Sequence, residues 1–216
     1  MATLQSLLNS PDQSVRLKAA LTAGTYPDPA FIDVLVSQCA HEEDFFVRDT
    51  LSWALLRNDI PQVVARLQPE LISENSQAQS QALHTLTKIG DKQYYSLVRE
   101  DQLYSADDKI ASTAWRTASV LVSESEKPAL TAILISQLGR GDSDLQFDLT
   151  RFLCALGDCI VEPLAKAERS PEEAVRMHAA FTLLRFEEMK IDSKKIDSKK
   201  KSTVGGEGFE PPTSSV

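Results

Sequence analysis

The segment Ser10 to Ala23, SPDQSVRLKAALTA, recurs 160 residues later as Ser170 to Leu183, SPEEAVRMHAAFTL. Seven of the fourteen positions are identical, among them the Ser-Pro start, a Val-Arg pair and an Ala-Ala pair. A proline at the start followed by apolar residues three or four positions apart is typical of an amphipathic helix. The same helix motif therefore occurs twice, once near each end of the chain, which indicates a tandem repeat protein.

Four weaker copies lie between these two segments. Aligning all six on the first core position of the helix gives spacings of 32, 31, 32, 35 and 30 residues, a period that indicates a solenoid. The residues at this anchor position, and at four and eight positions after it, are all apolar, so each helix carries one buried stripe. They are Val15, Ala19 and Ala23; Val47, Leu51 and Leu55; Ala78, Ala82 and Leu86; Ile110, Ala114 and Ala118; Leu145, Leu149 and Leu153; and Val175, Ala179 and Leu183.

A shorter apolar segment precedes each copy, so each repeat is predicted to be a pair of antiparallel helices. Pro29 and Pro61 begin two of the first helices, where a proline costs no helical hydrogen bond, and Gly90 is expected to end a second helix. Tyr94 is expected on the first helix of the fourth pair. With no strand signal in the chain, we predict an all-α fold, an α-solenoid of about six helical hairpins over residues 1–189.

The repeated motif resembles the HEAT repeat. The matching residues are Asp12, Val15-Arg16 and Ala19-Ala20; Asp44, Val47-Arg48 and Trp53-Ala54-Leu55; and Glu172, Val175-Arg176 and Ala179-Ala180. The resemblance covers residues 2–189, and the period is similar to that of the short subtype in phycobilin-lyase-like (PBS lyase) HEAT proteins. It implies a right-handed α-α superhelix whose second helices line a concave surface that binds a partner.

The arginine that follows the anchor is predicted to have a structural role. Arg16, Arg48 and Arg176 sit at the edge of the buried stripe, where pairing with an acidic residue of the same or a neighbouring repeat would tie the turns together. In the third to fifth copies a glutamine or alanine replaces the arginine. The predicted structural repeat residues are Val15, Arg16, Ala19, Val47, Arg48, Val175, Arg176 and Ala179.

Positions two and six after each anchor face away from the buried stripe. The sixth positions are Leu21, Trp53, His84, Arg116, Arg151 and Phe181. We predict that Trp53, His84, Arg116 and Arg151 form a binding column on the concave face, because an aromatic ring, an imidazole and two guanidinium groups suit an acidic or planar ligand. The alternative is that Trp53 packs against neighbouring helices and that the arginines are solvated.

We predict no catalytic residue, no metal site and no cofactor. The chain has no glycine-rich phosphate loop, no nucleophile elbow and no HExxH motif. Its histidines and cysteines lack the spacing of metal ligands, and the cysteines are expected to be buried thiols of a reducing compartment. They are His41, His84, His178, Cys39, Cys154 and Cys159. The acidic groups at Glu42-Glu43-Asp44 and Asp107-Asp108 precede helices, where they are expected to be caps.

The charge of the repeat region argues against a nucleic-acid partner. Residues 190–216 hold six of the 23 basic and four of the 31 acidic residues, which leaves residues 1–189 with a net charge of −10. A protein that tracks phosphates normally displays a basic stripe. No apolar run is long enough to cross a bilayer, and the start MATLQSLLNS lacks the features of a signal peptide, so we expect a cytoplasmic monomer that does not bind membranes.

Residues 190–216 are predicted to be a disordered, low-complexity tail, because a tandem IDSKK and a lysine run offer too little apolar content to fold. The ending GFEPPT resembles the translation of a transfer RNA gene, which suggests that this end has no function.

We expect the protein to be a non-catalytic scaffold or adaptor that binds a protein partner through its concave face. The alternative is a phycobilin-lyase-like or chaperone-like protein that handles a tetrapyrrole, whose propionates Arg116 and Arg151 could pair. A third, weaker alternative is an enzyme like the alkylpurine DNA glycosylases, HEAT-like solenoids with concave tryptophans, for which Trp53 and Trp115 would serve.

Overall fold

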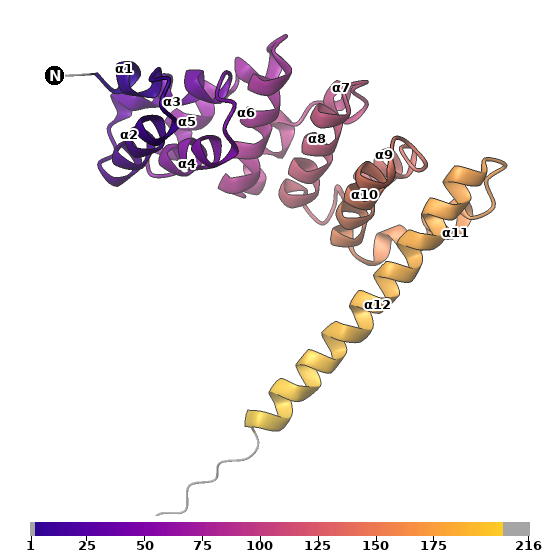
Figure 1. The fold of residues 1–216 in the computed structure, drawn as a ribbon. Coiled ribbons are helices and arrows are strands. Elements are labelled where there is room, and N and C mark those ends of the chain that lie inside the picture. The colour runs from indigo at the N-terminus through magenta and orange to yellow at the C-terminus, as the bar shows by residue number, and fades with distance from the viewer. Residues whose placement is uncertain (1–2, 205–216) are drawn as a thin grey trace, which may run out of the picture.

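The computed structural model describes the backbone of residues 3–204 and the side chains of residues 3–195. This part of the chain is helical and contains no strand, which confirms the predicted all-α solenoid. The helices pair in chain order, and the pairs stack side by side (Figure 1). The first helices of the pairs are α1 (Leu4–Leu8), α3 (Ile32–Cys39), α5 (Ile60–Leu67), α7 (Glu100–Leu103), α9 (Lys127–Ile135) and α11 (Val161–Ala167). The second helices are α2 (Gln13–Thr25), α4 (Phe45–Leu55), α6 (Ser76–Ile89), α8 (Asp108–Leu121), α10 (Ser143–Leu156) and α12 (Glu173–Val204).

Short 3-10 segments join several of these helices. They are η1 (Pro29–Phe31), η2 (Glu70–Ile72), η3 (Lys92–Leu97) and η4 (Asp158–Ile160). In the fourth pair the expected first helix is divided: Tyr94 lies in η3, and α7 begins only at Glu100. Val98 and Arg99 between them have extended backbones, with ψ angles of 115° and 148°, which breaks the helix.

The predicted apolar stripe is the core of the array. Fifteen of its eighteen residues are buried, and all of these except Ala78 and Ile110 belong to one continuous hydrophobic cluster that includes the apolar side chains of the first helices. The three half-buried residues are Val15, Val175 and Leu183, which lie in the first and last pairs. Each of those pairs has a neighbour on one side only, so less of its stripe is covered.

Acidic and amide side chains fix the starts of the second helices. The capping residues of α2, α4, α6, α8 and α10 each accept a hydrogen bond from a backbone N–H of the first turn, which satisfies a donor that has no partner within the helix. They are Asp12, Asp44, Asn75, Asp107 and Asp142. Asp44 and Asp107 are therefore caps, as predicted. Gly90 ends α6 with a φ of 69°, a left-handed conformation that glycine adopts without strain.

Each repeat arginine holds the turn before its own helix. Arg16 Nη1 donates to the carbonyl oxygens of Ser10 and Pro11 at 3.0 and 3.2 Å. Arg48 and Arg176 contact the carbonyls six and five residues before them in the same way. In the third and fifth copies, the glutamine in place of the arginine donates its amide to a carbonyl before the helix. Glutamine therefore takes over part of the arginine's contacts.

Arg16 also makes a contact between repeats. Its Nε and Nη2 each donate to a carboxylate oxygen of Glu42 at 2.8 Å, and the Glu42 side chain is only 1% exposed. Burial alone would raise the pKa of Glu42, but hydrogen bonds from Arg16, from the Asp44 backbone N–H and from Gln38 hold this pKa below its ordinary value. Among the described residues, Arg48 forms no such ion pair, so the predicted acid and arginine ladder is limited to this junction.

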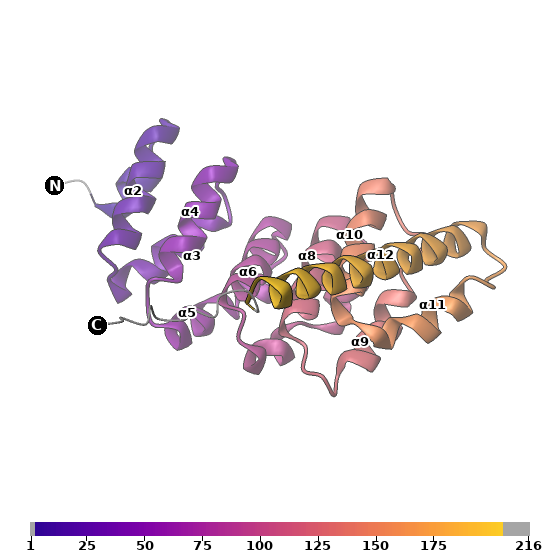
Figure 2. The ribbon, with the colours of Figure 1, turned by 90° about the horizontal axis from the view of Figure 1, so that it is seen from below.

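Helix α12 continues well beyond the predicted end of the array near Met189, and reaches Val204. No proline or glycine interrupts residues 173–204, and Lys190 pairs with Asp158 at 2.8 Å. The predicted disordered tail is thus helical over residues 190–204, because the sequence there contains no residue that breaks a helix. In Figures 1 and 2, α12 runs beneath α10 and α8 away from α11. The predicted GFEPPT ending lies outside the described residues.

Candidate functional site

The side chains two and six positions after each anchor lie on the second helices, which occupy one side of the array (Figure 1). We refer to this surface as the inner face. Its residues are Leu17 and Leu21; Asp49 and Trp53; Ser80 and His84; Ser112 and Arg116; Phe147 and Arg151; and Met177 and Phe181. The middle of the inner face is polar, and its two ends are mostly apolar.

A groove of about 480 Å³ opens in the polar middle, between α4, α6 and α8. Among successive second helices, α4 and α6 make the fewest contacts with each other, which leaves room for the groove. We refer to it as the central groove. Its lining residues are Phe45, Arg48, Asp49, Ser80, Gln81, His84, Lys109, Ser112, Thr113 and Arg116.

The central groove is positively charged on a protein whose net charge is −8. Arg48, Lys109 and Arg116 line it, against a single carboxylate, Asp49. Lys88 already binds this carboxylate, with Nζ to Oδ1 at 2.6 Å. No ion pair or hydrogen bond joins the side chain of Lys109 or Arg116 to another described residue, so both remain available to an anionic ligand.

His84 is half-buried in the same groove. Burial lowers its pKa, and the nearby charges of Lys88 and Arg116 lower it further, whereas Asp49 acts in the opposite direction with its Oδ1 3.8 Å from Nε2. The imidazole is therefore neutral near pH 7 and can either donate or accept a hydrogen bond.

Ser80 adds a polar group with no assigned partner. It is 2% exposed, lines the central groove, and its hydroxyl oxygen has no hydrogen-bond partner within the described residues. The neighbouring Ser112, in contrast, donates to Asp148 at 3.2 Å. A buried hydroxyl without a partner is costly, so such a group often marks the place of a ligand or a water molecule.

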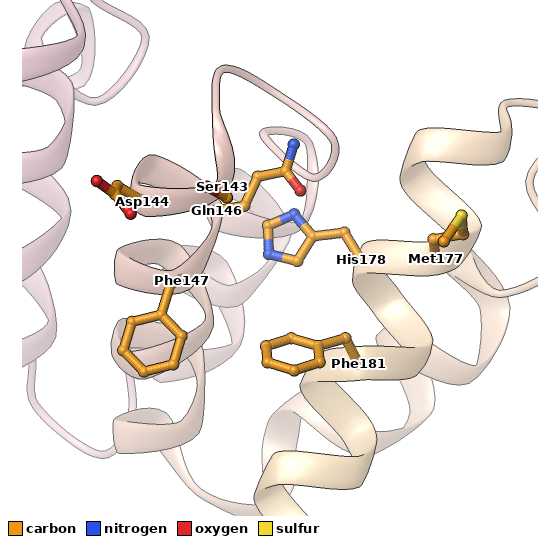
Figure 3. Close-up of a pocket in the computed structure, with 7 residues that line it drawn as sticks. All are labelled: Ser143, Asp144, Gln146, Phe147, Met177, His178 and Phe181. Carbon is orange, nitrogen blue, oxygen red and sulfur yellow. The ribbon is translucent and has the colours of Figure 1, made fainter.

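A second hollow, also of about 480 Å³, lies at the C-terminal end of the inner face (Figure 3). Phe147 of α10 and Phe181 of α12 face each other across it, and Met177 stands beside them on α12. Their exposed fractions are 46, 43 and 66%. We refer to this hollow, lined also by Ser143, Asp144, Gln146 and His178, as the apolar pocket.

His178 lines the apolar pocket and is held by hydrogen bonds through both of its ring nitrogens. Its Nδ1 accepts from the Gly139 N–H at 3.1 Å, so Nε2 carries the proton and donates to the Thr150 hydroxyl at 3.0 Å. Thr150 in turn contacts Thr182, whose hydroxyl donates to the His178 carbonyl. Burial lowers the pKa of His178. The histidine therefore joins α10 to α12 in its neutral form.

The structure brings only part of the predicted column together. His84 and Arg116 share the central groove, whereas Trp53 and Arg151 lie outside it. The Trp53 ring packs on Gly24 of α2, where it occupies the space that a Cβ atom would need. Arg151 is 63% exposed, and its nearest carboxylate oxygen, on Asp148, is 3.5 Å away.

Other residues of the site were missed by the sequence prediction. Lys109, Ser80 and Phe45 line the central groove, and Phe147 and Met177 line the apolar pocket. Three of the five stand two positions after an anchor, so a closer reading of that position would have found them. The other two precede the anchor, and only the stacking of the helices brings them to the groove.

Trp115 lies in the core. It is fully buried, its Nε1 donates to the Leu103 carbonyl at 2.9 Å, and the Arg140 guanidinium lies 5.6 Å from its ring centroid. Of the two tryptophans that suggested a likeness to DNA glycosylases, only Trp53 therefore reaches the inner face.

The described residues contain no cluster of three or more histidine, cysteine or carboxylate side chains placed to hold a metal ion. Cys39, Cys154 and Cys159 are free thiols, and burial raises the pKa of Cys39 to about 12. Over the same part of the chain, no helix has the length and apolar content to span a membrane.

Comparison with known proteins gives partial matches. No curated protein matches the sequence. Two crystal structures of engineered proteins are 18 and 20% identical, each over 86% of this chain and 97 and 95% of theirs, both with a TM-score of 0.46. A designed armadillo repeat protein is 14% identical over 85% of this chain and 98% of its own, with a TM-score of 0.45. Residues 1–56, which contain α1 to α4, match the family model of HEAT repeats.

Proposed function

We propose that this protein is a non-catalytic adaptor that binds a segment of another protein along its inner face, as a monomer in the cytoplasm. The exposed side chains of the inner face support this proposal. A soluble protein rarely leaves several large apolar side chains exposed on one surface unless that surface binds something. A repeat array suits an extended segment, because each pair of helices offers a similar surface to the next stretch of the ligand.

The apolar pocket is the observation that carries the proposal. Phe147, Met177 and Phe181 come from two neighbouring repeats and surround one hollow, with polar groups at its edge (Figure 3). This arrangement resembles the anchor pockets of protein interfaces, where one buried aromatic or aliphatic side chain contributes much of the binding energy. An apolar side chain of the partner would fill the hollow between α10 and α12.

Partner capture with paired variants tests the proposal. The double variant Phe147→Ala and Phe181→Ala should lose the partners that the wild-type protein retains from a cell extract, as quantified by mass spectrometry. Leu184→Ala is the matched control, because Leu184 is 59% exposed on the same helix but does not line the apolar pocket. Each of the two substitutions should weaken the binding of a purified partner by about 2 kcal/mol, which is a roughly 30-fold loss of affinity. Equal capture by the double variant and the control would contradict the proposal.

The second candidate function is the handling of a linear tetrapyrrole. Its support is the presence of Arg116 and His84 in one groove beside Phe45, where a propionate could pair with the arginine and a ring could contact the imidazole or the aromatic ring. An absorbance titration with biliverdin distinguishes this function from the adaptor. A saturable spectral shift that Arg116→Ala abolishes would favour tetrapyrrole handling. The absence of any shift would contradict tetrapyrrole handling and would be consistent with the adaptor function.

A further inference from the structure

We propose that the central groove is a site for the phosphomonoester group of a phosphoserine or phosphothreonine in the bound segment. This inference rests on the proposed adaptor function and specifies its ligand. The central groove would bind the phosphate. The apolar pocket, which lies toward the C-terminal end of the array, would bind an apolar side chain of the same segment.

The charges of the central groove match a dianion. Its lining contains three cationic side chains and one carboxylate, and that carboxylate is engaged by Lys88 at 2.6 Å. A phosphomonoester carries a charge of about −1.5 to −2 at pH 7, whereas a glutamate or aspartate side chain carries −1. The lining side chains alone carry two excess positive charges, which one phosphate neutralises and one carboxylate only half neutralises.

The hydrogen-bond donors of the groove also suit a phosphate. Lys109 and Arg116 make no hydrogen bond with their side chains to other described residues, so their donors can turn to the ligand without breaking a contact. Phosphate oxygens accept several such bonds, and charge-assisted bonds are the strong ones. Ser80 supplies a hydroxyl whose hydrogen-bonding capacity is unused within the described residues.

The positive charge is local, which favours a single phosphate over a nucleic acid. The whole chain has a net charge of −8, and the ends of the inner face are mostly apolar. A polyanion would find few further cations at the mostly apolar ends of the inner face, whereas a lone phosphate is bound within a few ångströms, where nearby charges outweigh distant ones.

His84 gives the site a direct readout. The charged groups that face it or line its groove are Arg48 and Asp49 of α4, Lys88 of α6, and Lys109 and Arg116 of α8. A dianion placed among them would favour the protonated imidazole, so the pKa of His84 should rise when the site is filled. Nuclear magnetic resonance of the imidazole signals follows this pKa in the full-length protein.

The first experiment compares N-acetyl-O-phosphoserine methylamide with N-acetylglutamate methylamide at pH 7.5, with the His84 signals as the readout. We expect saturable shifts with the phosphoserine compound, an affinity at least tenfold higher than for the glutamate compound, and a raised His84 pKa. Equal affinity for the two compounds would overturn the assignment of a phosphate. Glycerol phosphate and inorganic phosphate complete the series, and tighter binding of either would overturn the assignment to a protein side chain.

The second experiment uses a matched pair of variants. Arg116→Ala and Arg151→Ala remove the same side chain from the same position of neighbouring repeats, and both side chains are exposed, so the total charge changes equally. Arg116→Ala should weaken phosphoserine binding about tenfold, whereas Arg151→Ala should leave it within twofold. Equal losses of affinity in the two variants would mean that phosphoserine responds only to the overall charge of the protein. That result would overturn the assignment of the phosphate to the central groove.

The two proposals fail separately. Phe147→Ala with Phe181→Ala removes the apolar pocket and should leave the phosphoserine titration of His84 unchanged, even though capture of a partner is lost. If the wild-type protein captures partners through the apolar pocket but His84 does not respond to phosphoserine, the adaptor function stands and the phosphate site is wrong.

Discussion

Replacing Arg16 with alanine should destabilise the protein more than replacing Arg176, although the two arginines occupy the same position of the motif. Both donate to the carbonyls of the Ser-Pro pair before their helix, at distances of 2.8 to 3.2 Å. Both belong to a terminal repeat. Only Arg16 also binds a buried carboxylate, that of Glu42. The difference between the two variants therefore isolates the ion pair.

The magnitude follows from what each substitution leaves behind. Arg176→Ala removes hydrogen bonds to exposed or half-buried carbonyls and should cost about 1 to 2 kcal/mol. Arg16→Ala removes the same bonds and also leaves the Glu42 carboxylate, whose side chain is 1% exposed, without its cation. Breaking a buried ion pair costs about 3 to 5 kcal/mol. Because Gln38 and the Asp44 N–H still donate to the carboxylate, we expect about 3 kcal/mol in total.

Urea denaturation followed by circular dichroism measures both free energies of unfolding. The pH dependence provides a second check. The pKa of Glu42 is lowered in the folded state, so its contribution is fully present above the unfolded value near 4.5 and is lost as the pH falls through the folded value. The gap between the wild-type protein and Arg16→Ala should be largest near pH 8 and narrow as the pH falls, because without Arg16 the pKa of Glu42 lies higher and its protonation removes the unpaired charge in the variant. Equal losses for Arg16→Ala and Arg176→Ala would refute the reasoning.

Two further predictions concern packing and pH. Gly24→Ala should destabilise the fold by about 1 kcal/mol, because the collision of the new methyl group with the Trp53 ring outweighs the gain in helix propensity. In a protein that already carries Trp53→Ala, the same change should stabilise the fold by about 1 kcal/mol. Thermal melting of the wild-type protein, the two single variants and the double variant measures whether the sign of the effect reverses. Burial lowers the folded-state pKa of His178, so protonation favours the unfolded state and stability should fall as the pH drops below about 6.5. His178→Gln should reduce this loss between pH 7.5 and 5.5, and denaturation curves at the two pH values measure the difference.

The sequence by itself determined the repeat, the helical pairs and the buried stripe. These follow from local patterns: apolar residues at intervals of four, acidic or amide residues before each second helix, and a glycine where α6 ends. Each of them acts within one helix or one turn, so no knowledge of distant contacts is needed. The C-terminal end shows the limit of composition as a guide. Composition predicted disorder from residue 190, yet no helix-breaking residue follows until Gly205, and α12 continues to Val204.

The tertiary structure alone decided which side chains of the inner face lie together. The helical period places Trp53, His84, Arg116 and Arg151 at equivalent positions, but the spacing between neighbouring helices is not encoded in that period. Close contact of α2 and α4 brings the Trp53 ring onto Gly24, and sparse contact of α4 and α6 opens the central groove at His84. The depth and charge of the groove depend on how each pair packs on the next, which is a sum of many long-range contacts that no single stretch of the sequence contains.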